Sequence, residues 1–325
     1  MHDAFGRRIN YVRLSVTDRC NLRCTYCMAE DMQFMPRRDL LTFDEIERLA
    51  LHLVGRGVKR IRLTGGEPLV RKGIVDLVSR LTNLREHGLD EVTLTTNGTL
   101  LPELADDLAA AGIRRINVSL DTLDPARFAE LTRRDEFDKV MRGIDAARSA
   151  GLAVRINTVA MRGVNDGELP ALLAWCGERG FDLAMIEAMP LGDVSVDRKS
   201  THLDLTEVRK LLQQRFTLSP SIHRTGGPAR YFDVAETGTR IGFITPLSDN
   251  FCSGCNRIRI AATGTVYGCL GHDQKVELRE ILRAEGPGTL DDALDRLLAG
   301  KPLRHDFDID RAEPALTRHM SATGG

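Results

Sequence analysis

The stretch YVRLSVTDRCNLRCTYC, residues 11–27, joins a short strand to three closely spaced cysteines and decides the fold. In Tyr11–Val16 apolar and polar side chains alternate, which is the period of a β-strand with one apolar and one polar face. Cys20, Cys24 and Cys27 follow at once with the spacing C-x3-C-x2-C. They therefore lie on a loop at the carboxyl end of the strand, where α/β barrels carry their chemistry.

The three cysteines of this loop are suited to an iron-sulfur cluster. Three thiolates can bind three irons of a cubane cluster and leave the fourth iron open to another ligand. A structural zinc ion would need a fourth Cys or His, and His2 and His52 are poorly placed in the sequence to supply one. Zinc and three unrelated buried cysteines remain the alternatives for this loop.

Five further strand-like runs follow along the chain, separated by helical patterns. The six predicted strands are Tyr11–Val16, Arg60–Thr64, Glu91–Thr96, Arg115–Leu120, Ala153–Val159 and Leu183–Ala188. Five of them follow a glycine expected to end a helix in the left-handed conformation, namely Gly57, Gly88, Gly112, Gly151 and Gly180. Thr42 and Glu45 form a capping-box pattern at the start of one helix. This alternation predicts an α/β protein with six parallel strands.

The polar faces of these strands predict what they enclose. Buried parallel strands usually read as almost continuous Val, Ile and Leu, whereas polar residues alternate with apolar ones along four of these strands. The polar positions are Arg13, Ser15, Thr17, Arg62, Thr64, Thr93, Thr95, Asn97, Asn117, Ser119 and Asp121. With helices over the apolar faces, we predict an incomplete (β/α)6 TIM-like barrel whose wet lumen binds a ligand. The alternative is an antiparallel sheet with one solvated face, which the intervening helices disfavour.

Length and composition set the domain organisation and exclude several classes. The 325 residues, 42% of them hydrophobic, suffice for about two domains. The strand-helix rhythm ends after Met189, and we predict a partial barrel over residues 1–218 and a smaller region over 219–325. A formal net charge of −1 provides no basic field for nucleic acid or a membrane surface. Without an apolar run of ~18 residues or a signal peptide, we predict a cytoplasmic protein with neither partner.

A second set of three cysteines lies in the C-terminal region, where Cys252, Cys255 and Cys269 form C-x2-C-x13-C. No fourth cysteine accompanies them, which favours a second cluster with an open iron; a zinc site that includes His272 is the alternative. The run Arg257-Ile258-Arg259 alternates like a strand and would place both guanidinium groups on one face. Guanidinium forks match phosphate oxygens, so we predict an anion site beside this cluster, with a solvated edge strand as the alternative.

The loop CNLRCTYC, with an aromatic residue before its last cysteine, resembles the signature of the radical S-adenosylmethionine enzymes. The resemblance implies a partial six-stranded barrel, a [4Fe-4S] cluster on the first cysteine set and S-adenosylmethionine (SAM) at its open iron. It also implies that Tyr26 contacts SAM, that Gly66 in the segment TGGEP approaches the methionine amino group, and that Ser119 binds the cofactor's polar end. Without the family, TGGEP would be only a turn and Ser119 a satisfied barrel serine.

Longer segments resemble one branch of this family, whose members begin the biosynthesis of the molybdenum cofactor. The segments are DAFGR, RLTGGEPLVRKG, TLTTNGTLL, INVSLDTLD, INTVAMRGVND, GGPARYF, FCSGCNRIRIAATGTVYGCL and the terminal Gly324-Gly325. The branch implies a second [4Fe-4S] cluster that binds guanine, with GTP between the two clusters. The implied GTP contacts are Arg13, Arg62, Thr95, Arg155, Arg257, Ile258 and Arg259, and the main chain at Met189 would contact SAM.

The resemblance also implies the reaction and the partners. A 5′-deoxyadenosyl radical formed from SAM takes hydrogen from C3′ of GTP, and C3′ then attacks C8 of the same guanine. The implied product is (8S)-3′,8-cyclo-7,8-dihydroguanosine 5′-triphosphate. The implied partners are an electron donor such as flavodoxin or ferredoxin, a downstream cyclic pyranopterin monophosphate synthase, and a second copy of the chain in a homodimer. The protein's own task is to position the substrate.

Two positions depart from the pattern of this branch. Arg155 stands where its members commonly have Lys, and Ala184 stands where they usually have Arg, which leaves one cation fewer in the cavity. We hypothesise weaker or shifted substrate binding, or compensation by another arginine. The tail Gly324-Gly325 would by itself be a disordered terminus, whereas the resemblance threads it toward the active site.

Two other functions remain open from the sequence. One is a related radical enzyme that acts on a peptide or another substrate, although the auxiliary domains of such enzymes usually carry more than three cysteines. The other is a non-catalytic zinc or iron-sulfur module, which would have no use for the aromatic residue, the TGGEP segment and the polar lumen together. The seventh cysteine, Cys176 beside Trp175, is predicted to be a buried apolar thiol.

Overall fold

A computed structural model of the chain describes all residues except 193, 195–196, 284–286, 312–313 and 325. It contains the six predicted strands, each with both ends within one residue of the prediction. They are β1 (Tyr11–Ser15), β2 (Arg60–Thr64), β3 (Glu91–Thr96), β4 (Arg115–Ser119), β5 (Ala153–Ala160) and β6 (Asp182–Glu187). The five glycines predicted to end helices have φ between 71° and 100°, so the left-handed caps are confirmed.

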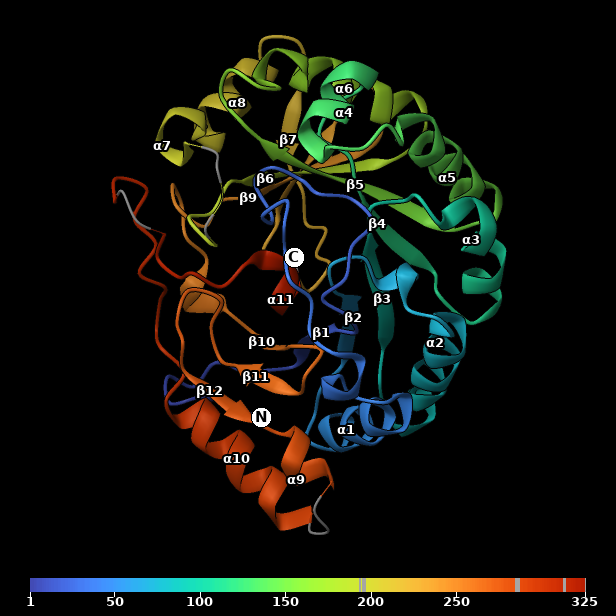
Figure 1. Ribbon diagram of the computed structural model, residues 1–325. Helices are drawn as coiled ribbons and strands as arrows, with labels where there is room; N and C mark the ends of the chain where they lie inside the picture. The colour runs from blue at the N-terminus through green and yellow to red at the C-terminus, as the bar shows by residue number, and fades with distance from the viewer. Residues whose placement is uncertain (193, 195–196, 284–286, 312–313, 325) are drawn as a thin grey trace.

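The helices α1 to α6 and α8 cover the outer face of the sheet, and among the described helices the short α11 lies in the centre of the ring of strands (Figure 1). The helices are α1 (Phe43–Gly55), α2 (Ile74–Asn83), α3 (Leu101–Ala110), α4 (Pro125–Thr132), α5 (Phe137–Ser149), α6 (Leu169–Glu178), α7 (Arg198–Thr201), α8 (Leu205–Leu212), α9 (Arg279–Arg283), α10 (Pro287–Ala299) and α11 (Met320–Thr323). Single 3-10 turns occur at Arg37–Asp39, Pro68–Val70, Leu84–His87, Asp166–Glu168 and Cys252–Gly254. In the part of the chain that is described, no helix is long and apolar enough to cross a membrane.

The C-terminal strands extend both edges of the central sheet. They are β7 (Leu218–Pro220), β8 (Arg230–Val234), β9 (Arg240–Ile244), β10 (Arg257–Ile260), β11 (Thr265–Tyr267) and β12 (Lys275–Glu277). The sheet has 12 strands in the order β12-β11-β10-β1-β2-β3-β4-β5-β6-β9-β8-β7, and it curves into an open barrel (Figure 1). Because β7 spans residue 218, the predicted boundary falls within a strand, and the division into 1–218 and 219–325 stays a prediction.

Two of these added strands correct the sequence analysis. β10 pairs in parallel with β1, and β9 pairs in parallel with β6, so the parallel part of the sheet has eight strands and not the six predicted. β10 lies between β1 and β11, which also excludes the solvated edge strand considered for the run Arg257–Arg259. The sequence analysis missed these two parallel pairings because strands that are far apart in the sequence can pair without any trace in the local hydrophobic pattern.

The register of the parallel strands brings the inward polar side chains into rows. Arg259 of β10, Arg13 of β1 and Arg62 of β2 lie side by side in one row. The apolar residues between them face outward; Val12 and Ile61, for example, are at most 1% exposed beneath the helices. One face of the sheet therefore forms the hydrophobic core with the helices, and the other face carries buried charge into the lumen.

Candidate active site

The lumen of the barrel holds two adjoining cavities. The first is lined by Cys20, Cys24 and Cys27 together with all four residues predicted to contact SAM, which are Tyr26, Gly66, Ser119 and Met189. Thr64, Glu67, Asn97 and Asp121 also belong to the polar part of its wall. The first cysteine set and the predicted cofactor residues thus share one cavity at the carboxyl ends of the strands.

Burial controls the chemistry of the first cysteine set. It raises the pKa of Cys20 to about 11 and that of Cys27 to about 12, and it holds the pKa of Cys24 well above its usual value. Each thiolate would also repel its neighbours, since the three charges lie close together. A bound cationic group would remove both penalties, and sulfur donors select iron or zinc over magnesium or calcium. The three thiols therefore fit an iron-sulfur cluster.

The glycines of the TGGEP segment pack against the main chain that leads into the cysteine loop. A Cβ atom on Gly65 would lie 2.5 Å from the carbonyl oxygen of Thr17, and one on Gly66 would collide with the carbonyl of Arg19. The Gly66 N–H donates to the Thr17 carbonyl at 2.8 Å, so a contact with SAM would use the carbonyl oxygen of Gly66. The two glycines therefore also fix the position of the cysteine loop.

Two buried carboxylates orient the polar wall of the first cavity. The Tyr26 hydroxyl donates to Asp121 at 2.6 Å, and Asp121 also accepts from the Val159 N–H at 2.8 Å. Burial raises the pKa of Asp121 to about 6 and that of Glu67 to about 7. Glu67 accepts from the Asn97 N–H at 2.6 Å and thereby ties the end of β3 to the TGGEP segment. The sequence alternation predicted Asp121 as an inward residue, but neither of these pairings.

The second cavity holds the second cysteine set and most of the predicted GTP residues. It is lined by Cys252, Cys255, Cys269, Arg13, Arg62, Arg155, Arg257 and Arg259. Burial raises the pKa of Cys269, as it does in the first set. It would also raise the pKa of Cys255, but the positive charges of Arg257 and Lys301 outweigh burial and hold this pKa below its usual value. This second set therefore also offers three sulfur ligands, here in a strongly positive environment.

Two of the buried arginines in this cavity, Arg62 and Arg155, have no carboxylate partner among the described residues. Burial lowers the pKa of Arg62 to about 10 and that of Arg259 to about 10, and burial together with Arg259 and Arg62 holds the pKa of Arg13 well below its usual range. Among the described residues, no carboxylate pairs with Arg62 or Arg155, and the Nε atom of each is buried without a hydrogen-bond partner. Buried guanidinium groups of this kind are costly unless an anion neutralises them. The cavity is therefore built for a polyanion.

The side chain of Tyr11 responds to the same positive field. It is 2% exposed, lines the second cavity and lies beneath the guanidinium group of Arg62, 5.7 Å from ring centroid to Cζ. Burial would raise the pKa of Tyr11, but the charges of Arg62 and Arg13 outweigh it and lower the pKa. The electrostatic potential of the cavity thus favours negative charge even on a phenol.

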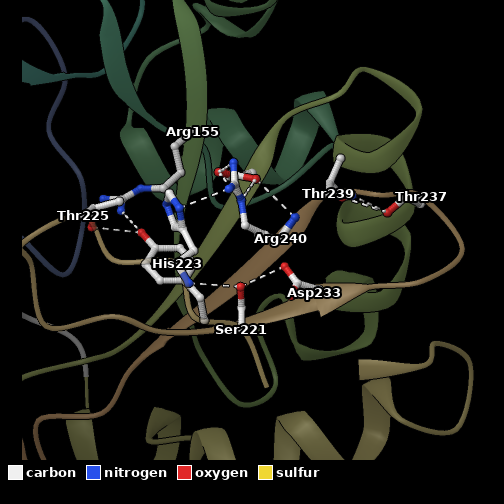
Figure 2. A network of polar contacts seen from close by, with 10 residues as sticks. Arg155, Ser221, His223, Thr225, Asp233, Thr237, Thr239 and Arg240 are labelled. Atoms are coloured by element: carbon white, nitrogen blue, oxygen red, sulfur yellow. Dashed lines mark hydrogen bonds and ion pairs between the residues drawn. The ribbon is translucent and has the colours of Figure 1, made fainter. Parts of the chain in front are cut away.

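Arg155 is held in place by a polar network at the side of the second cavity (Figure 2). Its Nη1 atom donates to the Tyr231 hydroxyl at 2.5 Å, and Thr225 Oγ1 lies 3.2 Å from the same hydroxyl. Farther out, Arg240 lies 3.0 Å from Nδ1 of His223, whose ring packs edge-on against Tyr231. The Nε group of Arg155 has no partner within this network and stays available to a ligand, while the bond to Tyr231 fixes the orientation of the guanidinium group.

The structure also places the other departure, Ala184. This residue is fully buried on β6 and pairs with Asn157 on one side and Gly242 on the other. A Cβ atom on Gly242 would lie 2.9 Å from the ring of Tyr231, so the glycine that pairs with Ala184 leaves room for that ring. The missing arginine at position 184 and the tyrosine that holds Arg155 therefore belong to the same part of the wall. Compensation through Arg155 stays a hypothesis.

Two of the residues predicted to contact GTP lie elsewhere. Thr95 lines the first cavity, where it accepts from the Asn117 amide at 3.4 Å. Ile258 lies on the outward face of β10 and is 1% exposed in the hydrophobic core, so its side chain cannot face the lumen. The reason is the alternation of the strand, which turns Ile258 away from its neighbours Arg257 and Arg259. A nucleotide could reach only the main chain of Ile258.

Four residues form the common wall of the two cavities, and the sequence analysis had assigned a role to only one of them. Asn157, Ile186, Met189 and Met320 line both cavities. Asn157 was not predicted, and its buried Oδ1 has no hydrogen-bond partner among the described residues. The alternation Arg155-x-Asn157 along β5 was the signal that could have found it. A ligand in either cavity would therefore lie next to a ligand in the other.

The C-terminal tail enters the lumen. α11 lies in the centre of the ring of strands (Figure 1), and Ser321 lines the first cavity. The carbonyl of Gly324 accepts from Nη1 of Arg259, and a Cβ atom on Gly324 would collide with Thr64. The alternative of a disordered terminus therefore does not hold for Gly324, while Gly325 lies outside the described residues.

Arg7, in the segment DAFGR, fastens the N-terminus to the loop of the second cysteine set. Its guanidinium group donates to the carbonyl of Cys252 at 2.8 Å and to the carbonyls of Leu303 and Pro302 at 2.7 Å each. Asp3 accepts from Arg7 Nε at 2.6 Å and balances the charge. DAFGR was among the segments that carried the resemblance, but nothing in its sequence predicted this contact.

Both cysteine sets offer a cluster three sulfur ligands from one cavity wall. Within the described residues, no three His, Cys, Asp or Glu side chains form a site for a single metal ion. His272, the ligand considered for a zinc site, lies 3.0 Å from the carbonyl oxygen of Arg304. The seventh cysteine, Cys176, is fully buried in the hydrophobic core as predicted.

Comparison with known proteins agrees with this geometry. The Radical SAM superfamily model matches residues 14–176, and the model Molybdenum Cofactor Synthesis C matches residues 181–307. The GTP 3′,8-cyclase of Erythrobacter litoralis (strain HTCC2594) is 57% identical over 99% of this chain and 98% of its own length. That of Rhizobium etli (strain CIAT 652) is 53% identical over 100% of this chain and 94% of its own. SuiB of Streptococcus suis, solved with S-adenosylmethionine bound, has a TM-score of 0.63 at 16% identity over 97% of this chain and 77% of its own, which shows a shared fold.

The open barrel with its cysteine loop and the matching family model define the class of this protein, which is a radical SAM enzyme. Members of this class use a [4Fe-4S] cluster and SAM, so the cofactors implied by the cysteine loop are those of the family. Within the class, relatives identical at more than half of all positions over the full length show that the chain belongs to the GTP 3′,8-cyclase family. Residues 181–307 match the family model that is named for molybdenum cofactor synthesis. The resemblance stated from the sequence is confirmed.

Proposed function

We propose that this protein converts GTP into (8S)-3′,8-cyclo-7,8-dihydroguanosine 5′-triphosphate, the first step of molybdenum cofactor biosynthesis. The observation that supports this best is the row of Arg259, Arg13 and Arg62 across three neighbouring strands of the second cavity. Buried guanidinium groups at the spacing of neighbouring strands match the oxygens of a triphosphate. The names of the full-length relatives support the same reaction.

In this proposal each cavity has its own ligand. Cys20, Cys24 and Cys27 hold a [4Fe-4S] cluster, and SAM fills the first cavity against Tyr26, Gly66, Ser119 and Met189. Cys252, Cys255 and Cys269 hold a second cluster, which binds guanine. The phosphates of GTP are bound by Arg13, Arg62, Arg155, Arg257 and Arg259. In this proposal Thr95 and the main chain of Ile258 make only minor contacts with GTP.

The residues of the chain perform a positional task. When bound, the first cluster and SAM supply the 5′-deoxyadenosyl radical that removes the hydrogen at C3′ of GTP. The arginines fix one end of the nucleotide and the second cysteine set fixes the other, so the ribose is held at the wall that Asn157 and Met189 share between the cavities. The buried lumen excludes water and other hydrogen donors from the carbon radical, and C8 of the guanine stays within its reach.

The partners of the reaction are proposed from the family. Flavodoxin or ferredoxin would supply the electron that the first cluster needs, and a cyclic pyranopterin monophosphate synthase would consume the product. We place the reaction in the cytoplasm, and we propose a homodimer as the working form of the enzyme. The net charge of −1 and the internal position of the arginines leave nucleic acid without a binding surface in this proposal.

The test is an anaerobic assay with GTP deuterated at C3′. The protein is reconstituted with iron and sulfide, given SAM and a strong reductant, and the 5′-deoxyadenosine formed is analysed by mass spectrometry. We expect its formation to depend on GTP and its 5′-methyl group to carry deuterium, with ATP as the matched control nucleotide. Cleavage of SAM that is indifferent to GTP would retain the radical chemistry and transfer the substrate to a peptide or another molecule. Colourless protein that contains zinc would contradict the proposal altogether.

A further inference from the structure

Lys301 is a buried cation that the arginine row does not include. It follows α10 and is only 2% exposed, and it is among the largest of the fully buried side chains. In the part of the chain that the structure describes, no carboxylate pairs with it. Removing an ammonium group from water is costly unless a negative charge lies nearby, so the fold must supply that charge in another form.

The side chain of Lys301 ends among the ligands of the second cysteine set. Its Nζ atom lies 3.6 Å from Sγ of Cys255 and donates to the carbonyl oxygen of Gly268, the residue before Cys269. Its stem runs along Gly268, where a Cβ atom would lie 3.4 Å from Cβ of Lys301. One ammonium group thus ties together two of the three cysteines, which are 14 residues apart in the spacing C-x2-C-x13-C.

We propose that Lys301 is the positioning residue and the internal counter-ion of the second cluster. This inference rests on the proposed function, because it needs a cluster on Cys252, Cys255 and Cys269. Three thiolates outweigh the charge of an oxidised [4Fe-4S] core, so the bound group is an anion in a buried place. Lys301 neutralises that anion, and the anion in turn provides the partner that the ammonium group lacks.

The charge of Lys301 then has a measurable consequence. Reduction adds a negative charge to the cluster, and a buried positive charge in contact with a ligand sulfur stabilises the reduced form. A purely structural lysine would influence the folding of the loop but leave the reduction potential unchanged. Removal of the charge is therefore expected to make the second cluster harder to reduce, by about tenfold or more in the equilibrium constant.

The experiment compares Lys301→Met and Lys301→Arg with the matched control Lys275→Met, an exposed lysine of the same region whose side chain is 52% exposed. Each full-length protein is reconstituted anaerobically, its iron is counted, and the second cluster is titrated by electron paramagnetic resonance. A Cys24→Ser variant identifies the signals of the first cluster. We expect a lower potential for Lys301→Met, and values close to those of the unmodified protein for Lys301→Arg and Lys275→Met.

A full iron content with an unchanged potential in Lys301→Met would overturn the inference. If Lys301→Met does not retain the cluster, the comparison of Lys301→Arg with Lys301→Gln decides: iron retained only with Arg supports the counter-ion, and equal iron and equal potentials contradict it. Absence of the second cluster is a distinct result, because the unmodified protein would then hold about four irons and not about eight. Failure of the GTP reaction alone is distinct as well, since the deuterium assay on the unmodified protein detects it while the potentials of the Lys301 variants still report on the counter-ion.

Discussion

At the scale of single residues, the buried arginine row trades stability for binding. Arg62 lies beside Arg13 in the sheet, and its Nε has no partner among the described residues. We predict that Arg62→Met weakens GTP binding by about tenfold to a hundredfold, because it removes charge-assisted hydrogen bonds worth ~1.5–3 kcal/mol. The same change should raise the free energy of unfolding of the nucleotide-free protein by ~1 kcal/mol, since an unpaired buried charge disappears. Anaerobic calorimetry and thermal unfolding measure the two effects.

A control on the same strand should give the opposite sign. Arg60 lies on β2 two residues before Arg62, but it faces Glu91 with 3.7 Å between Nε and Oε2 and lines neither cavity. Arg60→Met should therefore lower the stability, by up to ~1 kcal/mol. If Arg62→Met and Arg60→Met lower the free energy of unfolding equally, the buried charge of Arg62 does not destabilise the nucleotide-free protein. The electrostatic argument for a polyanion site would then be wrong.

At the scale of elements, one carboxylate braces α1 against α9. Glu45 closes the capping box of α1 by accepting from the Thr42 N–H at 2.7 Å, and it accepts from Arg283 of α9 at 2.6 Å. Burial raises the pKa of Glu45, but the hydrogen bonds from Arg283 and Thr42 outweigh it and hold the pKa below its usual range. A depressed pKa stabilises the fold above the unfolded value of about 4.3, and this contribution disappears as the pH falls through the folded pKa.

Glu45→Gln should therefore lower the free energy of unfolding by ~1 kcal/mol at pH 7. Between about pH 5 and pH 3 the variant should lose less stability than the unmodified protein, because it has no carboxylate left to protonate. Glu280→Gln is the matched control, since the Glu280 side chain is 74% exposed and its pair with Arg279 should contribute under ~0.5 kcal/mol. Urea unfolding at a series of pH values measures both, and parallel curves for Glu45→Gln and the unmodified protein would refute the brace.

Comparison of single elements shows which parts of the fold are legible in the sequence. β1 to β6 were predicted from local evidence, because four of them alternate polar and apolar residues and five follow the glycine that ends the preceding helix. β9 and β10 join opposite edges of the same sheet, and no local pattern records a partner such as β1, more than 240 residues earlier in the chain. The cavities follow the same rule. The cysteine sets were visible as spacings, and Asn157 could have been found from the alternation along β5, whereas the contacts of Lys301 and Arg7 arise only from packing.

At the scale of the whole molecule, the last residues of the chain complete a site that begins with the first strand. Gly324 has φ of +76°, its carbonyl accepts from Arg259 of β10, and it lies against Thr64 at the end of β2. We predict that Gly324→Ala reduces turnover by about tenfold or more while the iron content stays the same, because the new methyl group collides with Thr64 and displaces the tail. Deletion of both terminal glycines should abolish turnover with the clusters intact.

The choice of control separates this collision from backbone strain. Gly163 also has a positive φ, +68°, but a Cβ atom there would meet nothing within 4 Å. Gly163→Ala therefore carries the conformational cost of a left-handed alanine without the contact, ~1 kcal/mol, and should retain turnover. Thr64→Ala should partly restore the Gly324→Ala variant, because it removes the hydroxyl oxygen that lies nearest to the new methyl group. If Gly324→Ala turns over GTP as fast as Gly163→Ala, the tail only occupies the lumen. If it fails and Thr64→Ala restores it, the contact between the tail and the end of β2 shapes the active site.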